Sequence, residues 1–120
     1  QFYVLATLDA AADVKLMVDT GAAMTVLSVE VLAGLGYDLA AAPQRYFATA
    51  GGVVRAPVVH LTGFELGGRR MRDWPVGAID MPLSRNATGL LGMDFLSRQA
   101  FVIDQERELL MLGPRAVAGL

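Results

Sequence analysis

A chain of 120 residues has the length of one compact domain, and we expect a single domain over residues 1–120. Hydrophobic residues make up 54% of the sequence, enough to bury a core, and a net charge of −2 argues against a surface built for nucleic acid. The absence of cysteine excludes disulfides, thiolate metal sites and cysteine nucleophiles, and a single histidine excludes a metal site made of several histidines.

The first third of the sequence predicts short strands followed by one short helix. Ser28 is a candidate N-cap for a helix over residues 29–35, with Glu30 in its first turn and Gly36 as its stop. The strand-like runs before this helix are residues 2–8 (FYVLATL), 14–18 (VKLMV) and 24–28 (MTVLS).

The middle of the chain predicts two hairpins, each with paired glycines at its turn. Residues 45–61 form two strand-like arms around Ala50-Gly51-Gly52, and residues 64–79 repeat this arrangement around Gly67-Gly68. Pro75 predicts an edge or an irregularity in the second hairpin. The densest basic cluster, Gly68–Arg72, falls at this second turn and is short enough to be the rim of a hairpin.

The last third mixes a loop, a buried strand, a helix and a final hairpin. After a loop, TGLLG (residues 88–92) predicts a short buried strand, and residues 93–99 predict a helix in which Asp94 and Arg98 are spaced for an i,i+4 ion pair. Residues 101–112 then form a hairpin. The whole pattern is typical of a mainly β domain with one or two short helices.

Asp19 is the one acidic residue in the stretch KLMVDTGAAMTVLS, where it ends an apolar strand and precedes Thr20 and Gly21. An isolated aspartate at such a junction is usually a turn residue. The downstream context changes this interpretation, because VDTGAAMTVLS (18–28), the TAGGVV hairpin (49–54) and GLLGMDFL (89–96) occur in this order.

Together these three segments resemble a retropepsin-like aspartic protease. The resemblance is to the single-domain bacterial and cellular members, similar to the protease domain of the DNA-damage-inducible proteins, and it covers residues 2–113. It implies a retropepsin-like acid-protease half-barrel that works as a homodimer. It also implies an aspartic-type endopeptidase, acting on peptide or protein substrates without a cofactor or a metal.

The resemblance also implies a role for each matching residue. The catalytic group is Asp19, Thr20 and Gly21, in which the Thr20 hydroxyl reaches the partner's backbone and the Gly21 N–H supports the carboxylate. Substrate-binding residues are Ala22, the flap tip Ala50, Gly51 and Gly52, and an apolar pocket from Met81, Pro82 and Leu83. Structural support beneath the active-site loop comes from Leu90, Leu91 and Gly92.

A single Asp-Thr-Gly poses a problem, because aspartic protease chemistry needs two carboxylates about 3 Å apart that share one proton. A homodimer solves it by placing Asp19 against its own copy, so we predict an obligate homodimer with the hairpin 101–112 as part of the interface. None of the other aspartates lies in a second copy of the motif: Asp9, Asp13, Asp38, Asp73, Asp80, Asp94 and Asp104.

Two alternatives stay open at this point. The first is a catalytically weak or inactive retropepsin-like module for dimerisation or peptide binding, and the second is an unrelated β domain in which Asp19 is a turn residue. Other candidates for chemistry are weak: we expect His60 on the surface, Ser84 in a loop, Ser97 on a helix and Trp74 in the core or at its rim.

The sequence leaves the compartment open. No apolar run has the length of a membrane span, so we expect no membrane contact from this segment. The excess of arginine over lysine is compatible with a bacterial source, and the resemblance is compatible with a membrane tether elsewhere in a longer protein.

Overall fold

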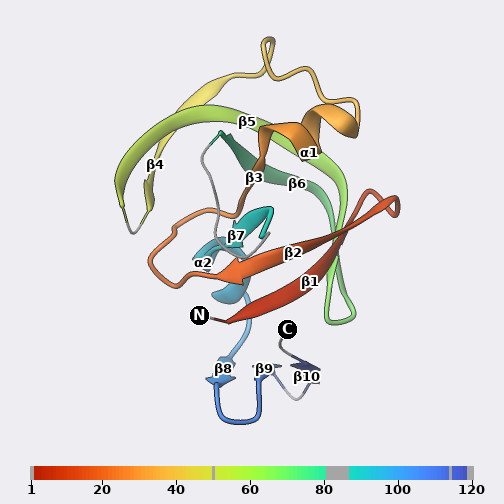
Figure 1. Ribbon diagram of the computed structural model, residues 1–120, viewed down its shortest axis with the longest axis vertical. Coiled ribbons are helices and arrows are strands. Elements are labelled where there is room, and N and C mark those ends of the chain that lie inside the picture. Colours follow the sequence, from red (N-terminus) through yellow and green to blue (C-terminus); the bar gives the residue numbers. More distant parts are fainter. Residues whose placement is uncertain (1, 50, 81–86, 114, 119–120) are drawn as a thin grey trace.

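The computed structural model describes residues 2–49, 51–80, 87–113 and 115–118, in which the chain forms ten strands and two short helices (Figure 1). In chain order these are β1 (Tyr3–Leu8), β2 (Ala12–Val18), β3 (Val26–Ser28), α1 (Val29–Gly34), β4 (Gln44–Thr49), β5 (Gly52–Leu66), β6 (Arg69–Ile79), β7 (Gly89–Leu91), α2 (Met93–Leu96), β8 (Phe101–Asp104), β9 (Leu109–Leu112) and β10 (Arg115–Ala118). The predicted mainly β fold with two short helices is confirmed.

Six of the strands close into a barrel. The sheet order is β1-β2-β7-β3-β6-β5-β4, and β1 also pairs with β5, so β1, β2, β7, β3, β6 and β5 form a ring with β4 attached outside it to β5. Most pairs are antiparallel, but β2 runs parallel to β7 and β3 runs parallel to β6. The parallel β2–β7 pair brings the C-terminal end of β2, and therefore Asp19, next to β7.

The β5–β6 hairpin spans the barrel and turns at the predicted glycine pair. Gly67 and Gly68 have φ angles of 59° and 80°, a conformation that side chains disfavour. The predicted irregularity near Pro75 lies at Asp73, whose φ is 52° and which leaves a gap in the β5–β6 ladder. At this gap the inward–outward alternation of side chains reverses in both strands. Arg72 and Trp74, two residues apart in β6, therefore face opposite sides, with Trp74 buried and Arg72 exposed.

Phe64, Trp74 and Phe95 form an aromatic cluster in the core. The Phe64 ring lies 6.2 Å from Trp74 and 5.6 Å from Phe95, measured between ring centroids, and the Phe95 side chain is fully buried. The Phe95 contact fixes α2 against the barrel, because aromatic pairs at these distances add to the free energy gained by burial.

The predicted ion pair between Asp94 and Arg98 is wrong. The Arg98 guanidinium lies 4.6 Å from the centroid of the Trp74 ring, a cation–π contact, and the Asp94 carboxylate accepts a hydrogen bond from Thr25 instead. The helix is also shorter than predicted, since α2 ends at Leu96 and the Gln99 side-chain amide donates to the carbonyl oxygen of this residue.

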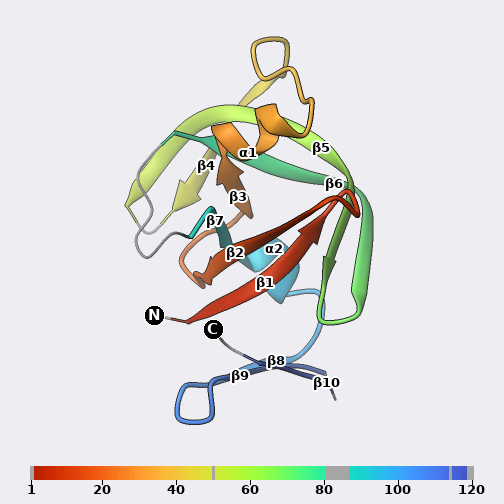
Figure 2. The same cartoon turned by 45° about the vertical axis from the view of Figure 1, so that its right-hand side comes forward.

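The C-terminal strands form a separate sheet in the order β10-β9-β8, which both views place below the barrel (Figures 1 and 2). The β8–β9 hairpin was predicted, and β10 is an additional strand. The sheet packs on the β5–β6 turn, where a Cβ atom at Gly67 would lie 2.6 Å from a Val117 methyl carbon. Among the described residues, no helix is long and apolar enough to cross a membrane.

Candidate active site

Asp19 is held by main-chain hydrogen bonds on both sides of its Cα atom. Its N–H donates to the Leu91 carbonyl oxygen on β7 at 2.9 Å, and its carbonyl oxygen accepts from the Ala22 N–H at 3.1 Å. The Gly21 N–H donates to Asp19 Oδ1 at 2.8 Å. These bonds fix both the position and the direction of the carboxylate at the end of β2.

The residues that follow Asp19 divide into exposed and buried ones. Thr20 and Gly21 are exposed. Ala22 is fully buried, and its carbonyl oxygen accepts from the Met93 N–H at 2.8 Å. The active-site loop, residues 19–24, therefore presents its first turn to the surface and anchors its centre to the start of α2.

Thr25 connects this loop to α2 and was missed in the sequence analysis. It is the one fully buried polar side chain among the described residues, and its hydroxyl donates to Asp94 Oδ1 at 2.8 Å. The Thr25 hydroxyl oxygen also accepts a hydrogen bond from the Gly92 N–H at 3.2 Å. The signal in the sequence was a threonine inside an apolar strand, since a buried hydroxyl requires a hydrogen-bond partner.

The segment Leu90-Leu91-Gly92 lies against the active-site loop. Leu90 and Leu91 are buried, and β7 pairs with both β2 and β3. A Cβ atom on Gly92 would lie 2.6 Å from the Met24 carbonyl carbon and 2.9 Å from the Ala22 carbonyl oxygen. Only glycine permits this approach, because both contacts are to main-chain atoms that have no freedom to turn away.

The β4–β5 hairpin contains the described glycines of the predicted flap tip, Gly51 and Gly52. Gly51 and Gly52 are exposed, and Gly52 has a φ of 120°. The Ala48 carbonyl oxygen on β4 accepts a hydrogen bond of 3.1 Å from the Ala23 N–H, so β4 touches the active-site loop. Four predicted site residues, Ala50, Met81, Pro82 and Leu83, lie outside the described residues, as does Ser84.

A cavity of about 350 Å³ borders β5 and the end of β6. Its lining is mostly apolar and includes Val54, Ala56 and Ile79, together with Val29 at the start of α1. The cavity has the size and chemistry to hold an apolar side chain.

The remaining candidates do not form a second catalytic group. His60 is exposed, with its Nδ1 atom 3.3 Å from Asp73 Oδ1, and Ser97 is exposed at the end of α2. Trp74 is buried in the core. In the part of the chain that the structure describes, no group of three or more histidine or acidic side chains is arranged to hold a metal ion.

The family model and the similar solved structures point to the same protein family. The model of the gag-polyprotein putative aspartyl protease family matches residues 6–98. The fold superposes with a TM-score of 0.71 on a retropepsin-like aspartic protease from Rickettsia conorii, with 31% identity over 98% of this chain and 84% of that chain.

A second structure, the retroviral protease-like domain of Ddi1 from Leishmania major, superposes with a TM-score of 0.68 at 21% identity, covering 99% of this chain and 95% of that chain. A search of curated proteins found no match. The family model spans most of the chain and includes the Asp-Thr-Gly loop, β7 and α2. The chain belongs to the retropepsin-like aspartic protease family.

Proposed function

We propose that the protein is an aspartic endopeptidase whose active site forms between the two Asp19 carboxylates of a homodimer. The observation that carries the proposal is the geometry of Asp19: main-chain bonds hold its carboxylate at the end of β2, while Thr20 and Gly21 beside it are exposed. This arrangement leaves the carboxylate and the Thr20 hydroxyl free to meet their copies across a two-fold axis.

The chemistry follows from two carboxylates that share one proton. The ionised Asp19 takes a proton from a water molecule as its oxygen attacks the peptide carbonyl carbon. The protonated Asp19 of the partner subunit donates a hydrogen bond to the carbonyl oxygen, and a proton is then delivered to the leaving nitrogen as the C–N bond breaks. The two carboxylates exchange roles without a covalent enzyme intermediate.

The substrate would lie extended between the flap and the active-site loop. In this proposal the flap tip Ala50, Gly51 and Gly52 covers the peptide, and Ala22 and the 81–83 segment complete the substrate site. The apolar cavity beside β5 supports a preference for apolar side chains near the scissile bond.

The C-terminal sheet supports the proposed dimer. Among the described strands, β8 pairs only with β9, so its outer edge is open to a partner strand. Val102 on this edge strand is 61% exposed, an unfavourable position for an apolar side chain unless another surface covers it. We therefore place part of the interface on the hairpin Phe101–Leu112.

A peptide-cleavage assay from acidic to neutral pH tests the function, with Asp19→Asn as the inactive variant and Asp13→Asn as its matched control. Asp13 is an exposed carboxylate at the opposite end of β2, bonded to the Thr7 hydroxyl. We expect Asp19→Asn to lower kcat/KM at least about a hundredfold, the usual contribution of a general acid or base. Asp13→Asn should retain activity.

The other outcomes separate the alternatives when sedimentation velocity is measured on the same samples. Cleavage that survives Asp19→Asn overturns the proposal. Dimers without cleavage in the wild type would identify a dimerisation or peptide-binding module. A protein that is monomeric at the assay concentration would support the alternative in which Asp19 is only a turn residue.

A further inference from the structure

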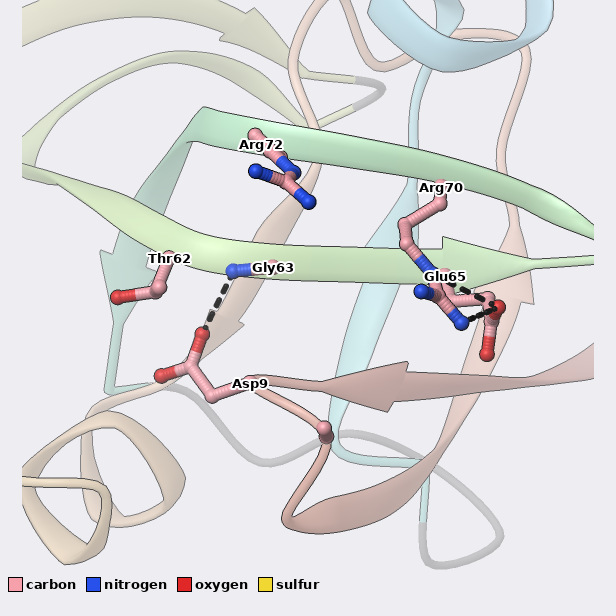
Figure 3. Close-up of a pocket in the computed structure, with 7 residues that line it drawn as sticks. Asp9, Thr62, Gly63, Glu65, Arg70 and Arg72 are labelled. Carbon is pink, nitrogen blue, oxygen red and sulfur yellow. Dashed lines mark hydrogen bonds and ion pairs between the residues drawn. The ribbon is translucent and has the colours of Figure 1, made fainter.

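A second hollow lies at the other end of β2 from Asp19, between the β1–β2 turn and the β5–β6 hairpin (Figure 3). Its volume is about 280 Å³. We call it the Arg72 pocket, and its lining includes Asp9, Thr62, Gly63, Glu65, Arg70 and Arg72. The closed barrel separates it from the proposed active site, so it is no part of the substrate cleft described above.

Both acidic side chains of the Arg72 pocket are already used. Asp9 Oδ1 accepts from the Gly63 N–H at 3.0 Å and Asp9 Oδ2 accepts from the Tyr37 hydroxyl at 2.7 Å. Glu65 Oε2 accepts two hydrogen bonds from the Arg70 guanidinium, at 3.0 Å and 3.2 Å. These bonds, drawn in part in Figure 3, use part of the acceptor capacity of both carboxylates.

Arg72 is different, because its guanidinium has no hydrogen-bond or ion-pair partner among the described residues. It stands opposite Gly63 in the β5–β6 register, and the missing side chain at Gly63 lets Arg72 extend toward β5 (Figure 3). The neighbouring Thr62 is bonded to the Tyr37 hydroxyl through both its main chain and its side chain. The unmet hydrogen-bond donors of the pocket are therefore mainly the five N–H groups of Arg72.

This balance of charges selects the class of ligand. A planar guanidinium with free donors matches a carboxylate, which it binds through two parallel hydrogen bonds. A doubly charged anion fits less well, because the Asp9 and Glu65 carboxylates share the pocket with Arg72. The volume exceeds what a lone carboxylate needs, since a water molecule occupies about 30 Å³ of the liquid, so the flanking backbone of a polypeptide has room as well.

We infer that the Arg72 pocket is an exosite that binds a glutamate or aspartate side chain of a polypeptide substrate, with its carboxylate on Arg72. That the polypeptide is a substrate rests on the proposed endopeptidase function. The binding itself does not, because it requires neither Asp19 nor cleavage.

The test is an NMR titration of the isotope-labelled Asp19→Asn protein, chosen because the proposed function predicts that this variant leaves the peptide intact. The probes are a capped Ser-Glu-Ser peptide and the isosteric Ser-Gln-Ser peptide, with sodium acetate and sodium phosphate as free anions. We expect the Glu peptide to shift the Gly63 amide and Arg72 Nε–H resonances, with an affinity up to about fivefold above that of the Gln peptide, the scale of one exposed charge pair.

Three variants localise the effect. Arg72→Gln should lower the affinity for the Glu peptide about fivefold, whereas Arg69→Gln, which removes an exposed arginine outside the pocket lining, should not. Gly63→Ala should also weaken binding by narrowing the pocket, and it should fold, because the added Cβ would lie 3.8 Å from Asp9 Cα, an ordinary contact distance.

Several results would overturn the inference. Equal affinity for the Glu and Gln peptides would show that no carboxylate is recognised, and equal loss in Arg72→Gln and Arg69→Gln would show only diffuse charge attraction. Acetate or phosphate binding as tightly as the Glu peptide would make this a site for free anions. A protein that cleaves peptides but fails this titration disproves the exosite alone, and one that binds but never cleaves disproves the proposed function alone.

Discussion

Replacing Thr25 with valine tests whether the buried link between the active-site loop and α2 holds the site together. Valine keeps the branched shape of the side chain and removes only the hydroxyl. In the variant the Gly92 N–H loses its acceptor, and Asp94 Oδ1 loses one of two donors and keeps the Phe95 N–H at 2.8 Å. The perturbation is therefore chemical and leaves the packing in place.

The expected cost follows from these two lost bonds. A buried N–H without a partner costs about 1–3 kcal/mol, and a hydrogen bond to a charged group contributes about 1.5–3 kcal/mol. Because Asp94 Oδ1 retains its second donor, the lower part of each range applies, and we expect Thr25→Val to lose about 2–4 kcal/mol. That is a large share of a typical free energy of unfolding of about 5–15 kcal/mol.

Urea unfolding at one fixed protein concentration measures this loss, since dimerisation would make the apparent stability depend on concentration. Thr25→Ser is the matched control, because it keeps the hydroxyl and loses one methyl group, worth about 0.8 kcal/mol. The reasoning is refuted if Thr25→Val is as stable as the wild type, or if Thr25→Ser is destabilised as strongly as Thr25→Val.

Three further predictions concern a glycine and two titrating groups. Gly92→Ala should destabilise by about 3 kcal/mol or more through main-chain overlap, whereas Gly34→Ala, which has open space around it in α1, should stabilise by about 0.5–1 kcal/mol in urea unfolding. Burial and the hydrogen bond to Asp9 raise the pKa of the Tyr37 hydroxyl above 10.0. The protonated hydroxyl therefore contributes its full share to the free energy of unfolding below pH 10.0, and this stabilisation is lost as the pH rises through the folded-state pKa. Tyr37→Phe should cost about 1–2 kcal/mol at neutral pH, and thermal melts should show this gap narrowing in alkali. Hydrogen bonds from Arg107 lower the pKa of Asp104 below 3.8. Above pH 3.8 the Asp104→Asn variant should therefore be less stable than the wild type. The stabilities of the two proteins should converge as the pH falls through the lower folded-state pKa.

The parts of the fold that the sequence predicted are those set by local rules. Alternating apolar residues and paired glycines located the β5–β6 hairpin, and Ser28 was correctly identified as the N-cap of α1, accepting from the Val31 N–H at 3.1 Å. The order of three motifs located the Asp-Thr-Gly loop after β2, the β4–β5 hairpin and β7. Each of these signals lies within a few residues of the structure that it specifies.

The contacts that were missed or wrongly predicted depend on residues that are brought together only by the fold. Thr25 and Asp94 are 69 residues apart, so no local pattern indicates that they meet. The expected partner of Asp94 was Arg98, but the face of Trp74 competes for this guanidinium, and only the folded barrel brings that ring within reach. Tertiary contacts overrode an i,i+4 spacing that contributes only about 0.2–0.5 kcal/mol in an isolated helix.

The two ends of β2 set a minimum length for a substrate that uses both proposed sites. The seven residues of β2, at about 3.3 Å per residue, separate Asp19 from the β1–β2 turn by roughly 23 Å. An extended polypeptide therefore needs at least about seven residues between the scissile bond and the acidic side chain that reaches Arg72. A shorter peptide occupies the cleft alone, so any contribution of Arg72 is confined to long substrates, and the ratio of KM for a short peptide to KM for a long acidic one should fall in Arg72→Gln.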